Sequence, residues 1–250
     1  MIDTHCHLDL CEPPTPELVD RAREAGVGRI ATVGMDGASI EHALEMSRAH
    51  DEVFAIVARH PHEAAGFAPA DLEEIERAAA DPGALAIGET GLDYYRERAP
   101  RDDQRRAFEA QLELAGRVGL PAVIHTRAAE ADTFAVLREH ADRLPAVILH
   151  CFSAADRLAE CVEHGYLCSF AGNVTYPKAT DLQRAARELP DELLLVETDA
   201  PFLSPQPVRG RPNEPANAVR TARFLAELRR KSYEELERTV ERNAARVLGW

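Results

Sequence analysis

The chain has 250 residues, of which 45% are hydrophobic and 29% are charged, so a disordered polymer is excluded and a sizeable core can form. Asp and Glu number 43 against 29 Lys and Arg, which gives a formal net charge of −14. This balance argues against a broad basic surface for duplex DNA, because nonspecific DNA affinity comes mainly from Lys and Arg displacing counterions. If the substrate carries phosphate, bound metal is the expected source of neutralising charge.

The sequence shows neither a membrane-spanning segment nor a secretory signal. No apolar run approaches the roughly 20 residues that cross a bilayer, and the first residues lack the basic and apolar regions of a signal peptide. We therefore expect a cytoplasmic protein without a membrane partner. The five cysteines are odd in number and include no CxxC pair, which is typical of reduced thiols.

Short apolar or β-branched runs alternate with longer stretches of helical period along most of the chain. The expected strands are Ile2–His5, Arg29–Val33, Val53–Ala58, Ala84–Gly88, Ala122–His125, Ala146–His150, Tyr166–Phe170 and Leu193–Thr198. The helices expected between and after them are Pro16–Ala25, Ser39–His50, Pro69–Ala80, Arg101–Val118, Ala129–Ala141, Ala154–Glu163 and Pro177–Glu188.

The C-terminal part departs from this alternation. A loop rich in Pro, Arg and Asn is expected over Pro201–Pro215, and two further helices over about Pro215–Arg229 and Ser232–Leu248. Two pairs have the spacing of a capping box at a helix start, namely Asp71 with Glu74 and Ser232 with Glu235.

Eight strands, of which the first seven are each followed by a helix, predict an α/β protein. Near-continuous apolar strands are typical of parallel strands covered on both faces. Eight such units in about 250 residues match the size of a closed (β/α)8 TIM barrel. We expect a single domain over residues 1–250 with extra C-terminal helices, because no interdomain linker is visible. A doubly wound open sheet is the alternative, since periodicity does not determine closure.

Six residues with metal-binding side chains fall at the carboxyl ends of expected strands. In a barrel these ends converge on one face, which carries the active site. Taken singly, each residue has an ordinary structural interpretation, such as a hydrogen-bonded histidine or a turn-forming carboxylate. Their combined placement on five strands favours a common site. The six are His5, His7, Glu89, His125, His150 and Asp199.

The His5-x-His7 pair is the strongest local signal. Alternation along a strand directs both imidazoles to the same side and directs Cys6 to the other side. Cys6 is therefore expected in the core rather than among the ligands. Cys151, directly after His150, receives the same interpretation.

Four imidazoles and two carboxylates can hold two divalent ions, although the donors do not distinguish Mg, Mn or Zn. Two ions about 4 Å apart can activate a water and stabilise both oxygens of a displacement. Asp199 and Glu89 are the expected catalytic residues, with Asp199 accepting a proton from the attacking water. The expected division gives the first ion His5, His7, Glu89 and Asp199, and the second ion His125 and His150, with Glu89 bridging.

Together with their neighbours, these residues resemble the TatD family of metal-dependent deoxyribonucleases in the amidohydrolase superfamily. The similarity covers almost the whole chain in the order of the family. The matching segments are DTHCHLD (3–9), RHPH (59–62), IGETGLDYY (87–95), PAVIHTR (121–127), LHCFS (149–153), FAGNVTYPKA (170–179), LLLVETDAPFLSP (193–205) and RGRPNEP (209–215).

The resemblance implies a (β/α)8 barrel, one or two divalent metals at its mouth, and hydrolysis of phosphodiester bonds in DNA. It carries the ligand role to the same six residues, with Glu89 in place of the carboxylated lysine that many amidohydrolases use. Arg59 departs from the pattern, because a small residue is expected before His60. That departure leaves the shape of this loop open.

Other residues are weaker candidates for substrate binding. Arg127 can bind a phosphate oxygen or form a salt bridge. His60 and His62 contact the substrate, support a metal ligand, or form an ordinary loop hydrogen bond. Arg209, Arg211 and Asn213 can bind phosphate, although Asn213 can instead anchor its own loop. Glu197 supports a ligand or an additional ion, or is a buried paired carboxylate. Four aromatic residues offer stacking faces or pack the loops, namely Tyr94, Tyr95, Phe152 and Tyr176.

The leading hypothesis is a metal-dependent hydrolase that trims ends of single-stranded or frayed DNA, with DNA as its partner and no obligate protein partner. An acidic protein suits this mode because few phosphates need to enter the metal-lined mouth. The first alternative is an amidohydrolase acting on a small amide, lactone or phosphoester, since the same metals and water serve either reaction. The second is a noncatalytic scaffold whose metals only tie the loops.

Overall fold

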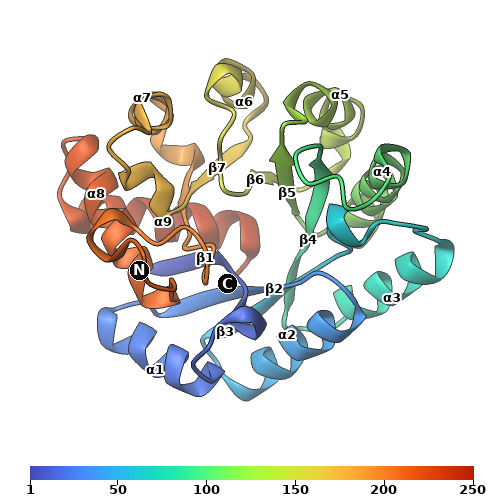
Figure 1. Cartoon of the computed structure of the whole chain (residues 1–250), viewed down its shortest axis with the longest axis horizontal. Coiled ribbons are helices and arrows are strands. Elements are labelled where there is room, and N and C mark those ends of the chain that lie inside the picture. The colour runs from blue at the N-terminus through green and yellow to red at the C-terminus, as the bar shows by residue number, and fades with distance from the viewer.

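The computed structural model describes all 250 residues and contains one sheet of eight parallel strands, ordered β1 to β8 as in the chain (Figure 1). The strands are β1 Ile2–Cys6, β2 Arg29–Gly34, β3 Val53–Val57, β4 Ala84–Asp93, β5 Ala122–Arg127, β6 Val147–Leu149, β7 Leu167–Phe170 and β8 Leu194–Val196. Each expected strand is therefore present.

One α-helix follows each of the first seven strands, and two follow β8. They are α1 Thr15–Ala25, α2 Gly37–Ala49, α3 Pro69–Ala79, α4 Arg101–Val118, α5 Glu130–His140, α6 Leu158–His164, α7 Thr180–Glu188, α8 Ala218–Leu228 and α9 Tyr233–Leu248. The helices surround the strands on the outside (Figure 1). None of them has both the length and the apolar character that a bilayer crossing needs.

The sheet closes on itself between β1 and the end of β8. Cys6 and Ala200 form a parallel β-bridge. The backbone N–H of Asp199 donates to the carbonyl of His5 at 2.9 Å, and that of His7 donates to the carbonyl of Ala200 at 2.7 Å. The closed barrel is thereby confirmed, and the open doubly wound sheet is wrong.

The core fills the barrel and the space between strands and helices. Ile30, Ile56 and Ile87 on successive strands are fully buried, as are Phe108 and Leu112 on α4. Burial of a side chain of this size contributes about 1.5–3 kcal/mol. The frame that carries the strand ends is therefore stabilised without help from the residues at the mouth.

Strand β4 is five residues longer than expected, because it continues past Gly88 to Asp93. Its last residues pair with β5, from Thr90 with Ile124 to Asp93 with Arg127. Gly91 makes this pairing possible: its φ is +140°, and an added Cβ would lie 2.0 Å from the carbonyl oxygen of His125. The Gly88 boundary was therefore wrong, and Glu89 lies within the strand.

One of the two predicted capping boxes is confirmed. At the start of α9, the hydroxyl of Ser232 accepts from the N–H of Glu235, and the Glu235 carboxylate accepts from the N–H of Ser232. The box at Asp71 was wrong. Helix α3 begins two residues earlier, and Asp71 is the residue that reaches back, accepting from the N–H of Ala68 at 2.8 Å.

Candidate metal centre

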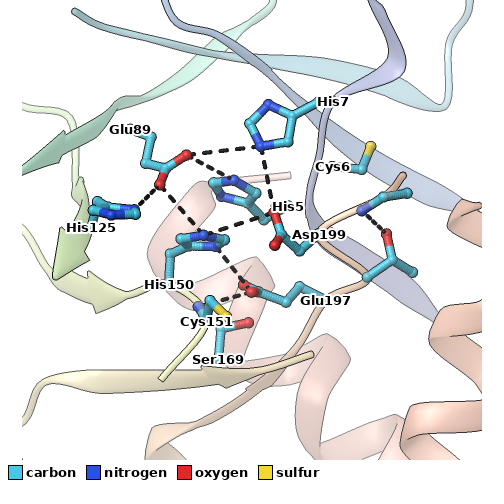
Figure 2. A network of polar contacts seen from close by, with 12 residues as sticks. His5, Cys6, His7, Glu89, His125, His150, Cys151, Ser169, Glu197 and Asp199 are labelled. Carbon is cyan, nitrogen blue, oxygen red and sulfur yellow. Dashed lines mark hydrogen bonds and ion pairs between the residues drawn. The ribbon is translucent and has the colours of Figure 1, made fainter. Parts of the chain in front are cut away.

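The six residues selected from the sequence lie together at the carboxyl ends of the strands (Figure 2). His5 is in β1, Glu89 in β4 and His125 in β5. His7 and His150 directly follow β1 and β6, and Asp199 lies three residues beyond the end of β8. The side chains of His125 and Asp199 are 16% and 13% exposed, whereas the other four are almost fully buried. The site is therefore largely buried, and His125 and Asp199 are its most exposed members.

Glu89 contacts four of the histidines, and its two oxygens face different ones (Figure 2). Oε2 lies 3.3 Å from Nε2 of His5 and 3.9 Å from Nε2 of His7. Oε1 lies 2.5 Å from Nδ1 of His125 and 3.5 Å from Nε2 of His150. One carboxylate thus stands between two separate sets of imidazoles, which is the arrangement that a bridging ligand needs.

On the β1 side, three donors converge from His5, His7 and Asp199, with their ligand atoms all within 4.8 Å of one another. Oδ1 of Asp199 lies 3.4 Å from Nε2 of His7. With Oε2 of Glu89 beside them, these residues form a group of four donors from three strands. It has the same members as the set expected for a first ion.

On the β5 side, the grouping differs from the expected pair. His150 shares a group with His5 and Glu89, whereas His125 shares one with Glu89 and His60. Nε2 of His60 lies 3.4 Å from Oε1 of Glu89. The structure therefore brings His60 among the possible metal donors, a role that the sequence did not assign to it.

The residues fit a divalent metal. Neither ring nitrogen of His5 nor Nδ1 of His7 has a hydrogen-bond partner, although these atoms are buried. A buried polar atom without a partner costs free energy, and such atoms are rare in folded proteins. Imidazole nitrogens and carboxylate oxygens are the donors that Zn and Mn accept, so a bound cation would satisfy these atoms.

The charges in the site are strongly coupled. Burial raises the pKa of Glu89, but the imidazoles of His150, His60 and His125 outweigh it and hold the pKa well below its usual value. Burial lowers the pKa of His125, but Glu89 and Asp93 outweigh it and raise the pKa to about 9. Without metal the carboxylate is therefore ionised and His125 protonated, so a cation must displace protons to bind.

His150 has a buried partner behind it. Oε1 of Glu197 lies 2.9 Å from Nδ1 of His150 and accepts the N–H of Cys151 at 2.8 Å. Burial lowers the pKa of His150, yet Glu197 and Glu89 raise it to about 10. A carboxylate on the far nitrogen fixes the orientation of a ligating imidazole. Glu197 thus takes a ligand-supporting position, one of the roles that the sequence left open.

The two cysteines next to the cluster differ in their surroundings from its histidines. Cys6 is fully buried, and its thiol points to the carbonyl of Ala31, away from the cluster. Cys151 lies beside His150 and Glu197, but burial and the charges of Asp199 and Glu197 raise the pKa of its thiol well above the ordinary value. A protonated thiol is a poor metal ligand.

Asp93 is a site residue that the sequence analysis missed. Its Oδ2 lies 2.8 Å from Nε2 of His62 and 3.3 Å from Nε2 of His125. Its Oδ1 accepts the backbone N–H groups of Tyr95 at 2.9 Å and Arg96 at 2.8 Å. The missed signal was alternation, because positions 89, 91 and 93 point to one side once β4 extends to Asp93.

The weaker candidates fall into two groups. The guanidinium of Arg127 lies 4.2 Å from the ring centroid of Tyr95, and neither it nor the exposed Arg209 has a carboxylate partner. By contrast, Asn213 is buried, with its amide donating to the carbonyl of Thr198 at 2.8 Å and accepting from Asn217. Arg127 and Arg209 are thus available to a ligand, whereas Asn213 anchors the loop behind Asp199.

The loop that begins at Arg59 has a definite shape. The Arg59 guanidinium turns away from the mouth and contacts Glu74 at 2.6 Å and Asp71 at 3.0 Å, both on α3. The side chain of Gln111 on α4 holds the backbone of Arg59, accepting its N–H and donating to its carbonyl. The large residue is therefore accommodated outside the site, and His60 still faces Glu89.

The aromatic residues also fall into two groups, those that pack the loops and those that are exposed near the mouth. Phe152 is buried against Phe170, and the hydroxyl of Tyr94 donates to Asp132, so both pack the loops. Tyr95 is 64% exposed beside Arg127. Phe202, which the sequence analysis did not select, is 50% exposed with its ring 6.0 Å from that of His7. The open mouth is therefore flanked by an aromatic ring on two sides.

Comparison with known proteins gives a consistent result. A family model described as TatD related DNase matches residues 2–249. A Mycobacterium tuberculosis protein named uncharacterized metal-dependent hydrolase TatD is 42% identical over 266 residues, covering 100% of this chain and 99% of that protein. A Musicola paradisiaca protein named 3'-5' ssDNA/RNA exonuclease TatD is 35% identical over 237 residues, covering 92% of this chain and 90% of that protein.

A solved structure agrees with these sequence relatives. The crystal structure of YJJV, a TatD homologue from Escherichia coli, aligns with a TM-score of 0.93 and 29% sequence identity, covering 100% of this chain and 98% of that one. Family, relatives and fold agree over the full length, and the family resemblance expected from the motifs is confirmed. The chain belongs to the TatD related DNase family.

Proposed function

We propose that the protein is a metal-dependent nuclease that removes nucleotides from ends of single-stranded DNA, beginning at the 3′ end. The observation that carries this proposal is the position of Glu89, whose two oxygens face two sets of imidazoles. The name of the Musicola paradisiaca relative supports a single-stranded nucleic acid as substrate and the 3′ polarity.

Two divalent ions suit the donors present. The first would be held by His5, His7, Glu89 and Asp199, and the second by Glu89, His125 and His150, with His60 as a further donor. Bound there, divalent cations would lower the pKa of a water to near neutrality and neutralise charge on the phosphodiester. The acidic chain supplies little other positive charge for this purpose.

The residues of the chain have separate roles in this proposal. Oδ1 of Asp199 takes the contacts with His7 and His150, which leaves Oδ2 to accept the proton of the attacking water. Arg127 lies at the mouth without a carboxylate partner, so its planar guanidinium can bind two phosphate oxygens. His62, held by Asp93, would orient the substrate at the same side.

The alternatives have less support. The names of the relatives favour a nuclease over an amidohydrolase of small amides or lactones. A noncatalytic scaffold is disfavoured because the core is continuous without the site, so the barrel does not need metal to fold.

The test is cleavage of a 5′-labelled single-stranded DNA by protein loaded with Mg, Mn or Zn, compared with the His125→Ala variant. We expect a ladder of products shortened from the 3′ end, and a loss of about 100-fold or more in His125→Ala. His164→Ala, which changes an exposed histidine at the end of α6, is the matched control and should retain activity.

Equal nucleotide release by the wild type and His125→Ala would refute the assigned site. Turnover of small esters without any cleavage of DNA would favour the amidohydrolase instead. A 3′-labelled strand and an RNA of the same sequence, tested in parallel, decide the polarity and the sugar preference.

A further inference from the structure

A cavity of about 490 Å³ lies between the loop from β7 to α7 and the loop after β8. Its wall includes Tyr176 and Lys178 from the first loop and Gln206 and Arg209 from the second. This volume is within the range of about 300–1,000 Å³ that is typical of small-ligand sites. No Asp or Glu lines the cavity, so its two cations make it locally positive on an acidic protein.

The cavity is next to the metal centre. Both loops leave the barrel at the carboxyl ends of their strands, the end that carries the His and acid cluster. The amide nitrogen of Asn173, which also lines the cavity, lies 4.0 Å from the sulfur of Cys151. Cys151 directly follows His150, so the cavity adjoins the His150 side of the cluster, whereas Arg127 and Tyr95 lie on the His125 side.

Hydrogen bonds between the two loops hold the shape of the cavity. The hydroxyl of Tyr176 donates to the carbonyl of Ser204 at 3.0 Å. The N–H of Gln206 donates to the hydroxyl of Thr175 at 2.7 Å. The amide of Gln183 on α7 donates to the carbonyl of Tyr176 at 2.9 Å. The ring of Tyr176 is therefore fixed before any ligand arrives, which reduces the entropy lost on binding.

The side chains that line the cavity can bind both the base and the phosphate of a nucleotide. The guanidinium of Arg209 lies 4.2 Å from the ring centroid of Tyr176, so the two form a stacked flat surface for a base. Neither Arg209 nor Lys178 has a carboxylate partner, so both charges are free for phosphate. The amides of Asn173 and Gln206 add donors and acceptors for the sugar or the base edge.

From these observations we propose that the cavity is a subsite for a second nucleotide of the substrate strand. Arg209 and Lys178 bind its phosphate, and the Tyr176–Arg209 surface stacks on its base. The proposal rests on the proposed function, because it places this nucleotide next along the strand from the one released. A strand crossing the mouth would then contact Arg127 on one side of the metals and this subsite on the other.

The test is the Lys178→Ala/Arg209→Ala double variant, assayed on dT12 and on bis(p-nitrophenyl) phosphate. The small diester has no nucleoside, so it reports the metal centre alone. We expect KM for dT12 to rise about tenfold or more while kcat stays within about twofold, since the variant loses binding remote from the reacting bond. Hydrolysis of the small diester should be unchanged.

The control is Arg187→Ala/Arg230→Ala, which removes two exposed, unpaired cations at the opposite end of the barrel from the metal centre. It should match the wild type. An unchanged KM for dT12 in the cavity variant, or an equal rise in the control, would overturn the subsite.

Binding measured without turnover separates the subsite from the proposed function. The anisotropy of labelled dT12, titrated in EDTA, should give a weaker affinity for the cavity variant. Its salt dependence should also be shallower by up to about 1.4 in slope, from two lost contacts with a single strand. Equal affinities and slopes would exclude the subsite, whereas wild-type protein that binds dT12 but never cleaves it would contradict only the proposed function.

Discussion

Oε1 of Glu197 lies 2.9 Å from Nδ1 of His150 at a position closed to solvent, so the orientation of this imidazole is set from behind the metal centre. With Nδ1 facing this carboxylate, Nε2 is the nitrogen directed at the cluster, 3.5 Å from Oε1 of Glu89 and 3.9 Å from Oδ1 of Asp199. The same Glu197 oxygen accepts the N–H of Cys151, which ties the chain after β6 to the end of β8.

This relationship predicts the effect of Glu197→Gln. The amide oxygen can still accept from Cys151, so the fold should be retained, but the charge opposite His150 is lost. We expect metal affinity to fall about 10–100-fold, as for other carboxylates behind ligating histidines. Competition with a chelator measures the change. Glu76→Gln, which alters a half-exposed glutamate near Arg117, is the control, and an equal affinity loss there would contradict the specific role of Glu197.

Asp93 supports the other side of the site, and Asp93→Asn tests that role. The variant keeps an oxygen for the N–H groups of Tyr95 and Arg96 but removes the charge that faces His62 and His125. We expect metal affinity to decrease about 10–100-fold and the pH for half-maximal metal binding to shift downward, since the pKa of His125 would fall. Asp132→Asn, which removes a charge beside the hydroxyl of Tyr94 and keeps an oxygen to accept its hydrogen bond, should bind metal normally.

The metal-free protein should lose stability as pH rises. The folded-state pKa values of His125 and His150, about 9 and about 10, lie above the ordinary 6.5. Their protons therefore contribute stability that is fully present below about pH 6.5 and is lost as pH rises through about 9 and 10. We expect the Tm in EDTA to fall between about pH 7 and about pH 10, and to fall less in His125→Gln. Parallel Tm curves for the two proteins would contradict this coupling.

The barrel and the cluster could be predicted because both depend on short-range patterns. Apolar strands alternating with helical stretches specify the units, and the carboxyl ends of parallel strands necessarily meet at one face. The motifs then identified which polar residues lie there. The division of the Glu89 oxygens between two sets of histidines required coordinates, because it depends on the side-chain rotamer rather than on position in a strand.

The features of the site that the sequence did not predict also have physical explanations. Asp93 was overlooked because the strand was expected to end at Gly88, whereas Gly91 lets β4 continue past the backbone of His125 to Asp93. Phe202 reaches the mouth through the loop after β8, whose course no periodic pattern predicts. The direction of the Arg59 side chain, into the site or toward α3, depends on which carboxylates lie near it in space. Distance along the sequence does not predict that proximity.

Arg59 leads to a prediction about stability rather than activity. Its guanidinium is 9% exposed and contacts Glu74 and Asp71, which keep 37% and 32% of their own side-chain surface. Arg59→Ala should cost about 1–2 kcal/mol of unfolding free energy, less than the 3–5 kcal/mol of a fully buried pair, because water screens the carboxylates. Urea denaturation measures this cost, and a cycle with Glu74→Gln isolates the pairwise part. Since the backbone of Arg59 is held by Gln111, metal binding should stay within about twofold of wild type. A large loss of metal affinity in Arg59→Ala, without loss of stability, would show that the side chain instead positions His60.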